Sequence, residues 1–284
     1  MSLAAGLAGL SALCFGTALV TAKVGLRSLD ARAGAGISIP SATLLLAAAA
    51  PFALETAGFT LRALLLFAVV GLFFPALVTL LTFRSNDRLG PAVTSALSGT
   101  SPLFALAAAA LLLGERIPPQ ALLATCGVAA GVALLSWKGR GGKALAERAL
   151  WLPLAGALLR GLAQALAKAG LALWPNPFAA SLIGYIVSSG TVLAADRLRR
   201  AGARRSRLAA LWFVGTGLLN GAAVMLMYAA LSAAPVSTVA PIVAAYPVVT
   251  VLLGAAVLRE ESMSPRILAG AGVIVAAVAY LVSG

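Results

Sequence analysis

Arg160 is the one ionisable residue in the middle of a long apolar segment, which is predicted to run from residue 149 to 170. It lies about 17 Å along an α-helix from the start of that segment. A charge buried at such depth is costly and marks a functional site, so we expect it to meet the carboxylate of a substrate. An alternative of equal weight shifts the segment boundary and lets the arginine side chain reach the membrane surface.

Other polar residues fall at a similar depth, with aromatic residues nearby. Amide and hydroxyl groups suit the carboxylate and ammonium groups of a zwitterion, and an aromatic wall suits an uncharged side chain. Hydroxyl residues also hydrogen-bond between membrane helices, which is the favoured interpretation for serine and threonine. Gln164 and Asn220 cost more to bury unpaired, and for them binding and packing roles carry equal weight. The predicted substrate-binding residues are Phe74, Thr79, Ser98, Ser101, Arg160, Gln164, Asn220, Tyr228 and Tyr246.

Residue types needed for other chemistry are missing from the apolar segments. The chain has no histidine, its two cysteines (Cys14 and Cys126) lie inside apolar runs, and all 8 acidic residues fall at segment ends or in loops. This pattern provides no metal site, disulfide framework or nucleophile motif, so neither a cofactor nor an enzyme activity is expected. No carboxylate lies where it could carry a proton across a membrane, which favours facilitated transport down the substrate's own gradient.

Hydrophobic residues make up 61% of the 284 residues and charged residues only 10%, with a mean hydropathy of +1.02. A soluble surface needs more charge, and apolar runs of about 20 residues match a helix that crosses a bilayer. The sequence therefore predicts an all-α integral membrane protein with ten transmembrane helices, located in the cell inner membrane. The predicted spans are about 3–22, 33–54, 62–83, 91–113, 119–137, 149–170, 177–195, 208–231, 236–258 and 265–283.

Basic residues gather at one face of the predicted spans. The net charge is +13, but the lysines and arginines lie in short loops, where they set the topology and are not expected to bind nucleic acid. Most follow spans 1, 3, 5, 7 and 9, and only Arg62, Arg116 and Lys168 lie at the other face. The positive-inside rule then places the first face, including the arginine-rich loop 196–207, in the cytoplasm and both termini outside.

The second half of the chain repeats the first after a shift of 145 residues, which carries Pro102 onto Pro247 and Lys23 onto Lys168. A fixed period with shared punctuation indicates an internal repeat. Because five spans are an odd number, the second copy must enter the membrane from the opposite side. The chain is therefore predicted to form two inverted five-helix repeats, residues 1–145 and 146–284.

Repeat-related residues are also predicted to act as hinges and latches when the two halves move relative to each other. Proline interrupts the hydrogen bonds of a helix, so Pro102 and Pro247 are predicted hinges, although membrane helices also tolerate proline without a function. Charged residues at span ends are predicted to form two latches, each closing one face. The alternative is that all four residues are independent caps at the membrane surface. The latch pairs are Lys23 with Glu260 and Lys168 with Glu115.

The chain resembles the drug/metabolite transporter superfamily, in its ten-helix form built from two EamA-like halves. The resemblance covers the whole chain and rests on the repeat, on Phe15 and Gly16 early in span 1, and on Pro102 followed by Gly114 and Glu115. The family often has tryptophan in place of Phe15 and is commonly drawn with cytoplasmic termini, against the charge distribution here. The resemblance implies secondary transport of small metabolites, commonly export, and the chain is most similar in character to bacterial amino-acid exporters, including those for aromatic amino acids.

These patterns together predict a secondary transporter that exports small metabolites by alternating access, with amino acids as the favoured substrates. The alternatives are a lipid flippase and a structural membrane subunit. The expected partners are the small-molecule substrate and membrane lipids, and the sequence leaves a monomer and a homodimer equally open.

Overall fold

The computed structural model describes residues 2–136, 149–197, 206–258 and 265–283, and within these ranges the chain is helical and has no strand. Long apolar runs favour helices because, without water, every backbone group must find its partner inside the segment. The helices are α1 (Ser2–Leu26), α2 (Ala31–Ala53), α3 (Leu61–Phe73), α4 (Ala76–Ser98), α5 (Ser101–Leu113), α6 (Pro119–Ser136), α8 (Trp151–Leu173), α9 (Pro177–Arg197), α10 (Arg207–Ala233), α11 (Val236–Val243), α12 (Tyr246–Leu253) and α13 (Pro265–Ser283). A π-helical turn, Gly254–Leu258, follows α12.

Six helical stretches in the described ranges are long and apolar enough to cross a bilayer, and two shorter apolar helices accompany them. The longest stretch, Leu61–Leu113, joins α3, α4 and α5 across their breaks. Leucines point outward from the bundle, and Leu111 is 84% exposed. Such a surface suits lipid and not water. The chain is therefore a multi-pass membrane protein, and the number of ten spans remains a prediction.

Several helices are interrupted, as predicted near Pro102 and Pro247. α4 breaks at Gly90, whose φ of 81° and ψ of 166° define a backbone conformation open almost only to glycine. Its first part continues α3 beyond a break at Pro75, and its second part leads into α5. α11 and α12 are separated by a further break, whereas Pro241 lies within α11 without ending it.

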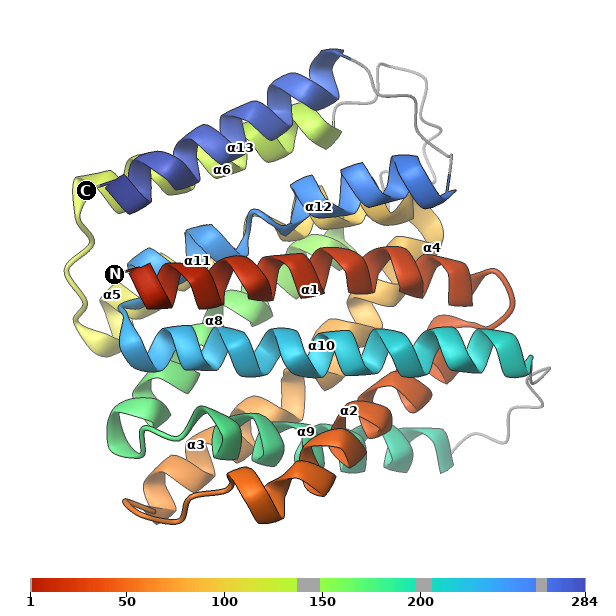
Figure 1. Ribbon diagram of the computed structural model, residues 1–284, viewed down its shortest axis with the longest axis vertical. Helices are drawn as coiled ribbons and strands as arrows, with labels where there is room; N and C mark the ends of the chain where they lie inside the picture. The colour runs from red at the N-terminus through yellow and green to blue at the C-terminus, as the bar shows by residue number, and fades with distance from the viewer. Residues whose placement is uncertain (1, 137–148, 198–205, 259–264, 284) are drawn as a thin grey trace.

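Helices at repeat-related positions contact each other. The 145-residue shift carries α6 onto α13 and α2 onto α9, and both pairs are packed together. Glycine allows a close approach, because a Cβ atom at Gly131 of α6 would lie 2.7 Å from the carbonyl oxygen of Gly270 in α13. Figure 1 shows both pairs antiparallel, which is what an inverted repeat requires. The predicted boundary between residues 145 and 146 lies outside the described residues.

The two ends of the bundle carry different connections. Both chain termini lie at one end, together with the junction of α10 and α11, whereas α1, α6 and α9 end at the other (Figure 1). This division matches the two faces expected from the placement of basic residues. Which end faces the cytoplasm remains a prediction, and most of the arginine-rich loop, residues 198–205, lies outside the described residues.

Candidate functional site

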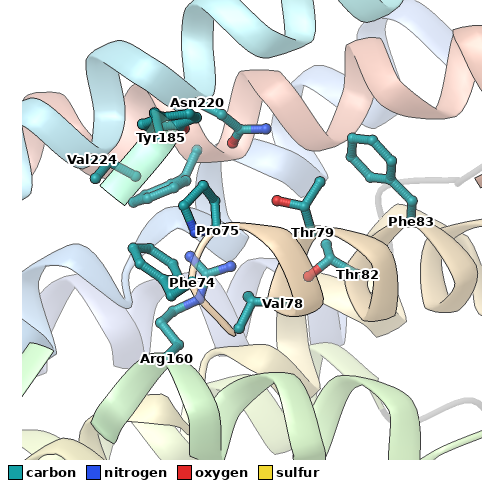
Figure 2. Close-up of a pocket in the computed structure, with 11 residues that line it drawn as sticks. Phe74, Pro75, Val78, Thr79, Thr82, Phe83, Arg160, Tyr185, Asn220 and Val224 are labelled. Carbon is teal, nitrogen blue, oxygen red and sulfur yellow. The ribbon is translucent and has the colours of Figure 1, made fainter. Parts of the chain in front are cut away.

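A small cavity lies among α1, α4, α8, α9 and α10, and the side chains that line it are drawn in Figure 2. The lining residues are Phe15, Phe74, Pro75, Val78, Thr79, Thr82, Phe83, Arg160, Tyr185, Asn220 and Val224. An adjoining hollow shares five of these residues and adds Ala18, Leu19 and Tyr246.

Arg160 projects from the middle of α8 into this cavity. The residue is only 6% exposed, and its guanidinium carbon lies 4.8 Å from the ring centroid of Phe15, 5.7 Å from that of Tyr246 and 5.9 Å from that of Phe74. Aromatic faces attract a cation and stabilise it by up to about 2 kcal/mol where water is excluded. The alternative in which this arginine reaches the membrane surface is therefore wrong.

The edge of the Arg160 guanidinium remains without partners. Its Nε and Nη1 atoms are buried and have no hydrogen-bond acceptor among the described residues. None of the residues that line the cavity in the described ranges is acidic. Three aromatic rings lie close to the guanidinium, whereas its Nε–H and Nη1–H groups remain available to an acceptor oxygen of a carboxylate or phosphate.

Neutral polar groups line other parts of the cavity. Figure 2 shows Asn220 and Tyr185 across the cavity from Arg160, with Thr79 and Thr82 projecting from α4. The Tyr185 hydroxyl is buried without a hydrogen-bond partner among the described residues. These groups offer oxygen acceptors that suit an ammonium group and carry no charge of their own.

Close helix packing beside Arg160 positions the backbone of α8. The next residue, Gly161, faces α5 so closely that a Cβ atom there would lie 2.6 Å from the backbone nitrogen of Ala105. Only a residue without a side chain allows this approach between the two helices. α8 is therefore held against α5 at the level of the cavity.

The structure brings together part of the predicted substrate-binding set. Five members line the cavity or its adjoining hollow: Phe74, Thr79, Arg160, Asn220 and Tyr246. Four others are buried but do not line it: Ser98, Ser101, Gln164 and Tyr228. The Gln164 side-chain oxygen has no hydrogen-bond partner among the described residues.

Sequence reasoning missed several lining residues. Phe15 supported the family resemblance but was not assigned to the site. Thr82 follows Thr79 by three residues and so shares its helix face, and Tyr185 is a polar aromatic residue near the middle of a predicted span. Both signals were present in the sequence. Phe83 carried no such signal, because an aromatic residue in an apolar run is unremarkable.

The predicted hinge prolines lie just after helix breaks. Pro102 is in the first turn of α5 and Pro247 in the first turn of α12. The two breaks pack against each other, since a Cβ atom at Gly99 would lie 3.2 Å from Cγ of Pro247. Their action as hinges remains a prediction.

Two halves of the chain, residues 2–137 and 148–283, each match the model of the EamA-like transporter family. The chain belongs to this family. A search of curated proteins gave no match. One similar solved structure, titled "Crystal structure of protein", has a TM-score of 0.78 and 17% sequence identity, and the alignment covers 97% of this chain and 95% of the other. At that identity the likeness shows the fold alone.

The EamA family assigns the chain a general role as a membrane transporter of small solutes and not as an enzyme. The repeat that the sequence predicts agrees with two successive matches of one family model. These comparisons do not support the specificity for aromatic amino acids that the overall character of the sequence suggested.

Lys168 and Glu115, predicted to pair as a latch of this EamA-like transporter, both bind the connection between α10 and α11. The Lys168 ammonium donates to the carbonyl oxygens of Leu231 (2.6 Å) and Ala234 (3.0 Å). The Glu115 carboxylate accepts from the backbone N–H groups of Val236 (3.1 Å) and Ser237 (2.9 Å), and from the Ser237 hydroxyl. Each charge thus stabilises the helix end of opposite polarity.

The other predicted latch is only partly described. Lys23 donates to the carbonyl oxygens of Asn86 (3.3 Å) and Asp87 (3.5 Å), just before the break at Gly90. Glu260 lies outside the described residues. Both lysines therefore bind carbonyl groups near a helix end, and the gating role of all four residues remains a prediction.

Proposed function

We propose that this EamA-like transporter exports small solutes that carry a carboxylate, with apolar or aromatic amino acids as the favoured substrates. The observation that carries the proposal is Arg160, a buried cation that lies close to three aromatic rings and whose Nε and Nη1 donors have no acceptor among the described residues. We place the protein in the cell inner membrane, with export proceeding by alternating access.

A carboxylate removes the energetic deficit at Arg160. A buried hydrogen-bond donor without a partner costs about 1–3 kcal/mol, and hydrogen bonds between charged groups are stronger than neutral ones. A carboxylate beside the guanidinium supplies a charged acceptor to these donors, and the Arg160 side chain is only 6% exposed to solvent. An amide in the same place offers one neutral oxygen and recovers less, so the cavity should prefer the acid to its amide.

The remaining groups of an amino acid also find suitable partners. Thr79, Thr82 and Asn220 offer neutral oxygens for the ammonium group, and Val78 and Phe83 offer an apolar wall for the side chain. No acidic residue lines the described cavity, which agrees with transport down the substrate's own gradient without a proton-carrying carboxylate.

A lipid flippase is the alternative among transport functions. A small cavity lined by buried side chains, among them Phe74, Arg160 and Tyr185, suits a small solute better than a phospholipid, whose acyl chains need access to the bilayer. The preference for a small solute rests on the burial of these lining residues.

Transport in proteoliposomes tests the proposal. Proteoliposomes that contain the purified protein are loaded with unlabelled phenylalanine. The uptake of labelled phenylalanine, the uptake of labelled phenylalaninamide and the movement of a fluorescent phospholipid are then compared. We expect uptake of the acid only, and we expect Arg160→Gln to lower it at least about tenfold, since a charge-assisted pair is lost. Arg62→Gln, at an exposed position at a helix end, is the matched control and should transport normally. Equal uptake of the amide, or selective movement of the phospholipid, would overturn the proposal.

A further inference from the structure

The cavity is lined by residues that the internal repeat relates to one another. The 145-residue shift carries Phe15 onto Arg160, Pro75 onto Asn220 and Thr79 onto Val224, and all six residues line the same cavity. In an inverted repeat, a position and its equivalent meet only near the axis that relates the halves. The cavity therefore lies on this pseudo-two-fold axis.

The first of these pairs is in direct contact. The Arg160 guanidinium carbon lies 4.8 Å from the centroid of the Phe15 ring. Neighbouring contacts obey the same symmetry, because a Cβ atom at Gly16 would lie 2.6 Å from Cβ of Val249, and one at Gly161 would lie 2.7 Å from Cβ of Phe104. Val249 and Phe104 are themselves related by the shift of 145 residues.

The symmetry holds for position but not for chemistry. In each lining pair one member is polar and the other is apolar: Arg160 faces Phe15, Asn220 corresponds to Pro75, and Thr79 to Val224. A cavity with symmetric chemistry would present two cations or none. The departures from symmetry therefore determine which charged groups of a ligand the cavity accepts.

We propose that Phe15 and Arg160 form an axial pair that sets the charge selectivity of the cavity, and that Phe15 is a specificity-determining residue. A cation presented from position 15 would reach the same carboxylate as one presented from position 160. The phenylalanine limits the cavity to one guanidinium and thus to one anionic group of the substrate. This inference rests on the proposed function, since it takes a carboxylate as the group that Arg160 binds.

The axial position has a consequence for alternating access. When the two halves of an inverted repeat exchange conformations, groups on the axis keep equivalent surroundings and remain equally far from both faces. A carboxylate held by Arg160 then needs no transfer to a second binding group during the exchange. The substrate is released when its remaining contacts open toward one face.

Exchange of the two side chains tests the axial pair. Binding of phenylalanine to purified protein is measured by calorimetry for the wild type, Arg160→Phe, the exchange variant Phe15→Arg/Arg160→Phe, and the control Phe15→Leu/Arg160→Phe. We expect Arg160→Phe to lose at least about tenfold in affinity, and the exchange variant to return to within about threefold of the wild type. The control should remain as weak as Arg160→Phe.

A second variant addresses the case in which the exchange variant does not fold. Phe15→Arg alone places two guanidinium groups on the axis and should shift the preference from phenylalanine to glutarate, a dicarboxylate, by at least about tenfold. An unchanged preference for phenylalanine over glutarate contradicts the axial pair. Failure of both variants with an arginine at position 15 to fold contradicts it as well. If the wild type fails to bind phenylalanine through Arg160, the proposed function itself fails. If only the exchange fails, the proposed function stands and the axial pair falls.

Discussion

Asn220 provides the one side-chain amide among the described residues that line the cavity. It comes from α10 and lies across the cavity from Arg160 (Figure 2). Its repeat equivalent, Pro75, has no hydrogen-bonding side chain, so the amide function is delivered from one side only. This separation of a cation from a neutral acceptor fits a ligand with a carboxylate at one end and an ammonium group at the other.

Asn220→Leu should therefore distinguish the two ends of the substrate. We expect KM for phenylalanine to rise about tenfold, because a hydrogen bond to a charged ammonium group is lost. The KM for 3-phenylpropionate, which has the carboxylate but no ammonium group, should stay the same. Both values come from proteoliposome uptake, and a parallel rise for both compounds would show that the amide does not contact the ammonium group.

The sequence revealed Arg160 because a charge in an apolar segment is conspicuous, but it could not reveal the full lining. Gln164 lies one turn after Arg160 on the same helix and appeared equally well placed, yet it does not line the cavity. Tyr185 does line it, although nothing in its local sequence shows which neighbour α9 faces. Membership of a cavity depends on the rotation and crossing of packed helices, which apolar runs without a clear polar face do not specify.

At the scale of helices, close packing at glycine holds the cavity walls in place. Gly161 brings α8 against the backbone of α5, and Gly16 brings α1 against α12 in the same manner. The helical fold and the breaks near Pro102 and Pro247 were foreseeable, because apolar run lengths and prolines are local features. These helix contacts were not, since a glycine in a membrane segment does not identify its partner.

Gly161→Ala should destabilise the protein by about 1–3 kcal/mol, because the added Cβ atom meets backbone that has little room to shift. Gly156→Ala in the same helix is the matched control, since its nearest neighbours would lie 4.0 Å from the new Cβ atom. Thermal unfolding in detergent measures both. Equal melting temperatures for the two variants would show that the close contact between α8 and α5 does not contribute to the stability of the protein.

The paired breaks before Pro102 and Pro247 lead to a second prediction at this scale. Replacing either proline with alanine restores a backbone N–H and removes the ring that opposes a continuous helix. We expect transport to fall several-fold with little loss of folded yield, because a straighter helix still packs but bends less readily. Pro51→Ala, at an exposed position within α2, serves as the control. Wild-type transport by both variants would show that the prolines are merely tolerated.

At the scale of the whole molecule, Lys168 and Glu115 fasten the connection between α10 and α11 at the end that carries both termini. Each charge has hydrogen-bond partners at its own helix end, and the two charges also attract each other electrostatically. Reversing either charge should therefore weaken its interaction with a helix end.

Lys168→Glu and Glu115→Lys should each reduce stability by about 1 kcal/mol and slow transport, because each reverses a favourable interaction with a helix end. The double variant should remain as impaired as the single ones, because it restores the attraction between the two charges but leaves both helix ends facing the wrong charge. Melting temperatures and uptake rates measure the effect. Rescue in the double variant would instead indicate a direct latch between the two side chains.

The two ends of the molecule can be assigned to membrane faces by labelling. Ser28 and Thr56 are exposed and lie in connections at opposite ends of the bundle. In a variant lacking Cys14 and Cys126, Thr56→Cys should react with a membrane-impermeant maleimide in intact cells, and Ser28→Cys should react only after lysis. The opposite pattern would place the basic face outside and contradict the positive-inside assignment.

The burial of the Arg160 charge on the axis also bears on the membrane voltage. Moving one elementary charge through 100 mV costs about 2.3 kcal/mol, which is enough to slow or drive a carrier. A guanidinium that stays near the axis while the halves exchange crosses little of this field, and a zwitterionic cargo adds no net charge. We therefore expect exchange of amino acids by this protein to carry no current and to proceed at the same rate whether or not the membrane is polarised.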